Sequence, residues 1–303
     1  MLAKVNNKQK NIFMLSFTFM FLIGITLLGW YLSESSLKVD FTQTNISPNS
    51  KHLFGTDWMG RDMFNRTLSG LSMSIRIGVI TAGISSIIAL SLGTFAAFGG
   101  KTADGIVTWL IDLIMGIPHI LLLILISFAC GKGFLGVITG VTLTHWPSLA
   151  RVIRSEVLSL KNSDYISASQ KLGVSRFHIV KNHMIPHLLP QFLLGLILLF
   201  PHAILHEASI TFLGFGLAPE QPAIGIILSE SMRYLSTGKW WLGLFPGAFL
   251  VLIVILFDYA GHNLSKIFNV NQIHKLEDVW IKLPTKRYLK LKIYLSLLLN
   301  IMV

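Results

Sequence analysis

Charged residues and cysteine are both scarce in this sequence of 303 residues. Asp, Glu, Lys and Arg together make up 13% of the chain, whereas a soluble globular domain carries about 25%. The single cysteine, Cys130, excludes a disulfide framework within the chain and a cysteine-rich metal site. A complete phosphate-binding loop is also missing: Gly100-Lys101-Thr102 resembles the end of one, but Phe95 stands where its first glycine is needed. We therefore expect neither a soluble globular fold nor ATP binding by this chain.

Hydrophobic and basic residues are in excess. Hydrophobic residues make up 52% of the chain, the mean hydropathy is +0.65, and 25 Lys and Arg against 14 Asp and Glu give a net charge of +11. In a soluble protein such a charge would suggest nucleic-acid binding. In a chain this apolar it instead indicates cytoplasmic loops, where Lys and Arg accumulate. We therefore expect the lipid bilayer to be a partner of this chain, and we expect no binding of nucleic acid.

Six apolar runs approach or exceed the length of about 20 residues that spans a bilayer. Backbone polar groups in hydrocarbon must bond within their own segment, so these runs predict helices. The first run follows three lysines, as in a signal peptide, but no small-residue cleavage site closes it, and we interpret it as an uncleaved span. The sequence thus predicts an all-α integral membrane protein with spans at residues 12–32, 72–98, 105–130, 134–150, 188–213 and 240–261.

Basic residues set the expected orientation in the cell membrane. Lys4, Lys8 and Lys10 place the N-terminus in the cytoplasm, and six crossings return the C-terminus to the same side. We divide the multi-pass chain into an N-terminal span with an extracytoplasmic loop, a core that contains a long cytoplasmic loop, and a basic cytoplasmic tail. These parts are residues 1–71, residues 72–265 with the loop at 151–187, and residues 266–303.

The loop at 151–187 contains signals for two short helices. Asn162-Ser163-Asp164 is an N-cap cluster, and Gly173 stands where a helix would end in a left-handed C-cap. A second helix is predicted over 175–184, ending before Pro186, since proline disfavours the α conformation of the residue before it. Small residues in the middle of the first helix would let another protein approach its backbone.

This loop resembles the "EAA" coupling loop of ABC-importer permeases. Gly173 and Pro186 fall at the family spacing, whereas Ser167 replaces the usual Glu and Ser169 the second Ala. In that family the loop docks in a groove of the ATP-hydrolysing subunit. The resemblance implies docking through shape and small residues, without a carboxylate at Ser167. The residues that it assigns to ATPase coupling are Asp164, Tyr165, Ser167, Ala168, Ser169, Leu172, Gly173 and Pro186.

Further motifs resemble the dipeptide, oligopeptide and nickel permeases of that family. Residues 53–62 read Leu-Phe-Gly-Thr-Asp-Trp-Met-Gly-Arg-Asp, and residues 207–216 read Glu-Ala-Ser-Ile-Thr-Phe-Leu-Gly-Phe-Gly. The first motif is expected outside the cytoplasm, either contacting a substrate-delivery protein or, as we favour, pairing its acids with Arg61 and Arg66. Its key residues are Gly55, Asp57, Gly60, Arg61 and Asp62.

Membership of this family would imply that the chain forms one half of a transport pore. The partners would be a homologous second permease, two ATP-binding subunits and an extracytoplasmic substrate-binding protein. This chain would bind no cofactor and would not itself be an enzyme, since ATP would be used by the partner subunits. Its substrate would be a dipeptide, an oligopeptide, nickel or a metal chelate.

Candidate residues for the translocation path lie in the fifth run. His202 and His206 share a helix face, and ionisable residues within a membrane are candidates for function. With His119 and His145 they suit a metal pathway or polar contacts between helices, and no metal site is assigned. Glu207 lines the path or bonds a neighbouring helix. His206-Glu207 also begins a zincin motif whose second histidine would fall at Ile210, so an intramembrane metalloprotease remains an alternative, as does a passive channel.

Overall fold

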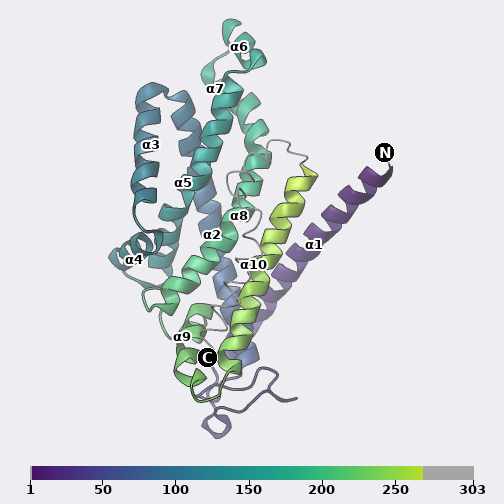
Figure 1. The fold of residues 1–303 in the computed structure, drawn as a ribbon, viewed down its shortest axis with the longest axis vertical. Helices are drawn as coiled ribbons and strands as arrows, with labels where there is room; N and C mark the ends of the chain where they lie inside the picture. The colour runs from purple at the N-terminus through teal and green to yellow at the C-terminus, as the bar shows by residue number, and fades with distance from the viewer. Residues whose placement is uncertain (1, 269–303) are drawn as a thin grey trace.

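The computed structural model describes residues 2–268, so most of the predicted tail at 266–303 lies outside the described residues. The described part is helical apart from one isolated bridge between Thr56 and Asp62 and its connecting loops (Figure 1). The α-helices are α1 (Leu2–Tyr31), α2 (Met63–Phe98), α3 (Gly100–Gly116), α4 (His119–Ala129), α5 (Gly133–Lys161), α6 (Asp164–Lys171), α7 (Arg176–Ile179), α8 (Ile185–Phe212), α9 (Ile224–Leu235) and α10 (Trp241–Ile267). Short helical turns η1 (Ser35–Leu37), η2 (Phe41–Gln43) and η3 (Val180–Met184) complete the list.

Within residues 2–268, four helices are long and apolar enough to cross a membrane: Gln9–Tyr31, Met63–Phe98, Val180–Phe212 and Trp241–Ile267. A fifth crossing is counted if the pair α3 and α4 forms one broken span, bent by 99°. α5 is long enough, with 29 residues, but is less apolar than the other four. An all-helical protein with several apolar helices is therefore confirmed, whereas the predicted count of six crossings stays a prediction.

The predicted uninterrupted helix over 105–130 is wrong, because the chain breaks between α3 and α4. Ile117 adopts an extended conformation, with φ −92° and ψ 139°, immediately before Pro118. The proline ring disfavours the α conformation of the residue before it and supplies no backbone N–H. The break directs α4 away from α3 and places His119 at the bend.

A second correction concerns Pro186, which does not end a helix. Ile185 is α-helical, with φ −55° and ψ −47°, and its N–H donates to the carbonyl of Val180, five residues back. This π-helical turn, η3, joins α7 to α8 and shifts the hydrogen-bond register just before Pro186, which has no backbone N–H to donate. The second helix of the loop thus continues directly into the membrane helix α8.

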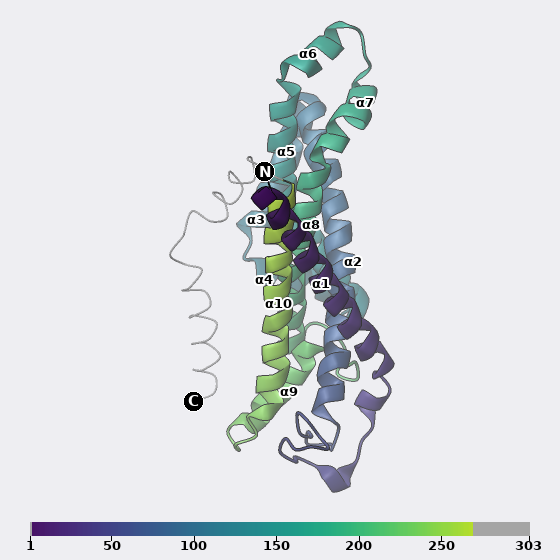
Figure 2. The ribbon, with the colours of Figure 1, turned by 90° about the vertical axis from the view of Figure 1, so that its right-hand side faces the viewer.

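The two ends of the molecule are distinct in both ribbon views (Figures 1 and 2). The beginning of α1 lies toward the same end as α6 and α7, while α9 and the segment between α1 and α2 lie at the opposite end. α2, α5, α8 and α10 run between these ends. The start of the chain and the predicted cytoplasmic loop at 151–187 therefore share one end of the molecule.

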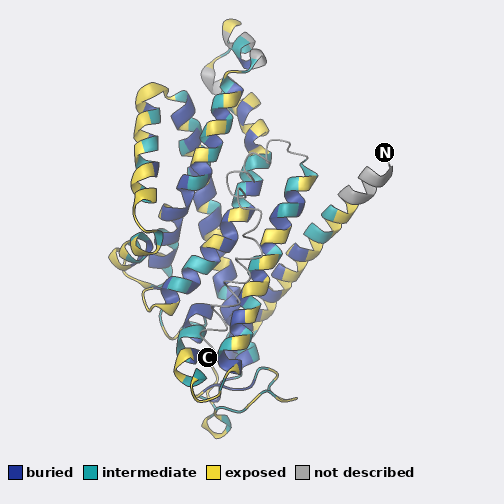
Figure 3. Cartoon of the chain, viewed as in Figure 1, coloured by how far each residue is buried: buried dark blue, intermediate teal, exposed yellow. Residues whose placement is uncertain are grey.

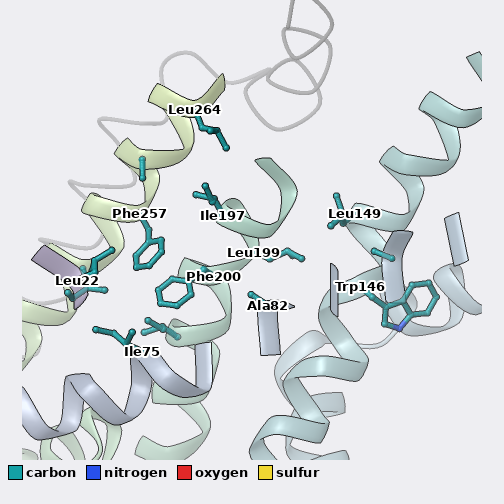
Figure 4. Packing of buried hydrophobic residues seen from close by; sticks show 14 of the residues in the cluster. Leu22, Ile75, Ala82, Trp146, Leu149, Ile197, Leu199, Phe200, Phe257 and Leu264 are labelled. Atoms are coloured by element: carbon teal, nitrogen blue, oxygen red, sulfur yellow. The ribbon is translucent and has the colours of Figure 1, made fainter. Parts of the chain in front are cut away.

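Small residues on α2 allow close helix packing at the centre of the fold. A side chain at Gly93 would approach the carbonyl oxygen of Ala150 on α5 to 2.7 Å, and Ser85 donates to the carbonyl of Thr142 at 2.9 Å. Between α8 and α10, Phe200 and Phe257 stack with ring centroids 3.6 Å apart (Figure 4). Dispersion contacts and interhelical hydrogen bonds are what hold helices together when lipid surrounds them. Exposed residues follow much of α1 and α3 instead (Figure 3).

Candidate functional site

The segment from α6 to α7 projects beyond the membrane helices at one end of the molecule (Figures 1 and 2). Gly173 has φ +79°, and the N–H of Val174 donates to the carbonyl of Ser169 at 3.2 Å. This bond, from the residue after the left-handed glycine back to the third-last helical residue, is the Schellman cap. The left-handed C-cap predicted at Gly173 is therefore confirmed.

The same segment has an anchored side and an outward side. Ile166 of α6 and Ile179 of α7 are fully buried and join the hydrophobic core of the protein. Leu172 is 84% exposed, and Ser167 and Ser169 are half-buried. The side chains of Asp164, Tyr165 and Ala168 lie outside the described residues. Among the described side chains of this segment, Ser167 and Ser169 are thus small and half-buried, and Lys171 and Leu172 after them are exposed.

The base of this segment is tied to the start of α3. Arg154 of α5 forms a two-bond ion pair with Asp104, and the ammonium of Lys161 donates to the carbonyl of Ala97 at 3.0 Å. Both partners lie at the junction of α2 and α3. These contacts fix the end of α5 to the junction of α2 and α3.

At the opposite end, the predicted extracytoplasmic motif forms a buried ion network. The Asp57 carboxylate accepts from Arg61 at 2.7 Å and from Arg66 at 2.6 Å. Glu230 of α9 binds the same two guanidinium groups at 3.1 and 2.9 Å. Asp57, Arg61 and Arg66 are 2%, 8% and 3% exposed. The network fastens the loop to α2 and α9, which supports the structural interpretation for Asp57.

Asp62 has a different role from the one predicted. Its carboxylate accepts from the N–H groups of Phe64 and Asn65 at 2.9 and 3.0 Å and so caps α2. Its second oxygen lies 2.7 Å from Nδ1 of His52. Gly55 and Gly60 both have φ +71°, and a side chain at Gly60 would collide with the backbone of the loop before it. All five predicted motif residues therefore lie together.

Glu230 was not predicted, although it completes the network. It is the one acidic residue of α9, a helix that the hydropathy pattern does not reveal because it is short and amphipathic. The count of charges in the motif did not reveal it, because Asp57 and Asp62 already balance Arg61 and Arg66 there, and only the structure shows that Asp62 caps α2 instead.

Within the membrane helices, Glu207 is fully buried. Its carboxylate accepts from the hydroxyl of Ser74 on α2 at 2.7 Å and from that of Thr211 at 3.0 Å. It bonds two helices together, which supports the second of the two interpretations of this residue. Its role in a path remains a prediction.

His206 is brought together with two histidines from other helices. Nδ1 of His206 lies 3.0 Å from Nε2 of His145 on α5, and its ring centroid lies 4.3 Å from that of His119 on α4. His202 is exposed one turn before His206 on α8. The sequence placed His202 and His206 on one face, but only the fold shows that His119 and His145 converge on the same point.

Comparisons with known proteins agree on the family. Residues 89–269 match the family model described as "Binding-protein-dependent transport system inner membrane component". The chain is 32% identical over 250 residues to the dipeptide transport system permease protein DppC of Bacillus subtilis (strain 168), covering 82% of this chain and 78% of that protein. It is 33% identical over 232 residues to the oligopeptide transport system permease protein OppC of the same strain, covering 75% of this chain and 76% of that protein.

A solved structure shares the fold. An inward-facing form of the MetNI methionine ABC transporter superposes with a TM-score of 0.53 at 20% sequence identity, covering 67% of this chain and 96% of that chain. The family match covers more than half of the chain and includes α3 to α10, with the α6 segment and the histidine-bearing helices. The chain therefore belongs to the family of inner membrane components of binding-protein-dependent transport systems.

Proposed function

We propose that this chain is the membrane-spanning permease subunit of an ATP-driven importer. Its substrate is a peptide, nickel or a metal chelate. The observation that carries the proposal is the identity of 32% to a dipeptide permease and 33% to an oligopeptide permease, over three quarters of the chain or more. The names of both relatives favour peptides as the substrate. The metal alternative rests on the resemblance to nickel permeases, and transport assays must decide between peptides and metals as the substrate.

The proposed coupling element is α6 with its glycine cap. A partner ATPase would dock on the outward side of α6, around Ser167, Ser169, Leu172 and Gly173. Movement of α6 would reach the membrane through two covalent routes, backward into α5 and forward through η3 into α8. Two arrangements of these packed helices, one open to each side, would be biased by ATP binding to the partners.

The proposed assembly contains a second, homologous permease, two ATPase subunits and an extracytoplasmic binding protein. The exposed apolar side of α3, with Trp109 and Leu113, would face lipid or the second permease. Six crossings, with α3 and α4 as one broken span and α5 as another, would place the termini and α6 in the cytoplasm. The ion network of Asp57 would then lie outside, where the binding protein delivers substrate.

Uptake into sealed vesicles tests the proposal against a protease and a channel. We expect ATP-dependent uptake of a labelled dipeptide or of radioactive nickel when the two permeases, the ATPase subunits and the binding protein are reconstituted together. Uptake that needs no ATPase subunits would favour a channel and contradict the proposal. A peptide-cleaving activity of the chain alone that disappears in Glu207→Gln would favour a protease.

A further inference from the structure

Three histidines from three helices meet inside the bundle. His119 begins α4, His145 lies in the middle of α5, and His206 lies in α8. One ring nitrogen from each of them can be chosen so that the three atoms all lie within 4.8 Å of one another. The ring centroids are 4.3 to 4.9 Å apart, and the rings are inclined to one another by 50° to 77°. Two of the three pairs therefore meet edge to face and the third is tilted, without parallel stacking.

Hydrogen bonding prepares one ligand nitrogen. Nδ1 of His145 lies 2.8 Å from the carbonyl oxygen of Val141, and because a carbonyl only accepts, Nδ1 carries the proton. Nε2 of His145 is then left with a lone pair directed at Nδ1 of His206. Histidines that bind metals are oriented in this way, donating the other ring N–H to a backbone carbonyl.

A second observation, at His119, also points to a bound ligand at this cluster. Nε2 of His119 is buried and has no hydrogen-bond partner. A buried polar atom without a partner is destabilising, so three converging rings are an unfavourable way to fill space between helices. Nε2 is one of the two ring nitrogens through which His119 can join this cluster, and a cation bound to it would give it a partner.

We propose that His119, His145 and His206 form a binding site for a divalent late first-row transition metal such as Ni²⁺, Co²⁺, Cu²⁺ or Zn²⁺. Imidazole nitrogens suit these ions, whereas Mg²⁺ and Ca²⁺ prefer oxygen ligands. Bonds of about 2.0–2.1 Å would bring tetrahedral nitrogen ligands to roughly 3.3 Å from one another. Because the nitrogens are at most 4.8 Å apart, the contraction needed is at most about 1.5 Å, within reach of ring rotations.

The site adjoins a groove through His119, which suits an ion that enters and leaves. His119 also lines a groove of about 420 Å³ at the α3–α4 bend, with Ile114, Met115, Ile117, Pro118 and Thr144. Structural zinc sites are closed by four protein ligands, whereas sites with three protein ligands leave a position for water or substrate. We therefore assign the ion to the cargo, free or held by a small chelator in the groove. This last step rests on the proposed function as an importer.

Metal binding by the full chain, purified in detergent without a polyhistidine tag, tests the site directly. We expect about one Co²⁺ per chain by visible absorption and one Ni²⁺ by calorimetry, with affinity falling as protons compete at low pH. His145→Asn and His206→Asn should each weaken binding at least tenfold. The matched control His187→Gln, on the same helix α8 but half-exposed at its other end, should bind as the unmodified chain does. Equal binding by all four proteins would overturn the proposal.

A measurement on the unmodified chain tests the site even where the histidine variants fail to fold. Diethyl pyrocarbonate modification of the unmodified chain, read by mass spectrometry, should be slowed by Ni²⁺ at His119 and His206 and unchanged at His178, which is exposed near α6. No protection at His119 and His206 would overturn the site.

Cargo is tested separately in reconstituted vesicles. His119→Ala should abolish uptake of radioactive nickel. Unchanged nickel uptake in this variant would overturn the cargo assignment and leave the importer function standing. Metal binding by the chain combined with no ATP-dependent uptake of any substrate would instead overturn the importer function and leave the metal site standing.

Discussion

Asp57 is predicted to be the most important single side chain for the stability of the end of the molecule opposite α6. In Asp57→Ala two guanidinium groups that are under a tenth exposed keep only Glu230 as a counter-ion, and the N–H groups of Met59 and Arg61 lose the carboxylate that they bond at 2.8 and 2.9 Å. Removing one partner of a buried ion pair costs about 3–5 kcal/mol, because the other charge remains buried. We expect a loss of this size.

The assay is thermal unfolding of the purified chain in detergent, with limited proteolysis between α1 and α2 as a second readout. Asp40→Asn is the control, because Asp40 is an acid of the same loop whose carboxylate bonds Thr42 and Gln43 and enters no ion pair of the described residues. Asp57→Ala should unfold several degrees below this control and be cut faster in the loop. Equal unfolding temperatures for the two variants would refute the reasoning, since the network would then contribute nothing.

Two further predictions use pairs of glycines. Gly173→Ala should reduce ATP-dependent uptake several-fold, because a left-handed conformation costs a residue with Cβ about 1–2 kcal/mol and α6 is short. The control Gly100→Ala, with φ +84° and equally open surroundings, should retain uptake. Equal losses of uptake in the two variants would contradict a specific role for the α6 cap. Gly29→Leu should lower the unfolding temperature, because its side chain would collide with the backbone of α2. Gly24→Leu, on the same helix with nothing within 4 Å, should not, and a reversed order of the two would show that α1 does not pack on α2 as described.

Much of the fold follows from local signals in the sequence. Apolar runs located α1, α2, α8 and α10, since length and hydropathy alone decide whether a helix crosses a bilayer. The cap at Gly173 was predictable because a left-handed residue at a helix end favours glycine. These features depend only on residues that are close together in the sequence, so they can be predicted from short segments of it.

Other features depend on packing between distant segments. The partnership of Arg61 with Glu230 joins residues 169 positions apart, and that of His145 with His206 joins residues 61 positions apart. No periodicity of a single helix reveals such pairs. Pro118 and Pro186 show the same limit: one proline breaks a helix, while the other is accommodated by a π-helical turn that α8 and its neighbours stabilise.

The central claim, that α6 is where a partner ATPase drives this permease, is tested most directly by crosslinking from its outward side. In a Cys130→Ser background, which removes the one native thiol, Leu172→Cys provides a thiol at an exposed position beside the α6 cap. Lys51→Cys provides one at an exposed position at the opposite end of the molecule. We predict that a short bifunctional reagent joins the chain to the ATPase subunit from position 172, blocks ATP-dependent uptake, and forms no such product from position 51. An ATPase crosslink from position 51, or none from position 172 in an assembled and transporting complex, would contradict the account.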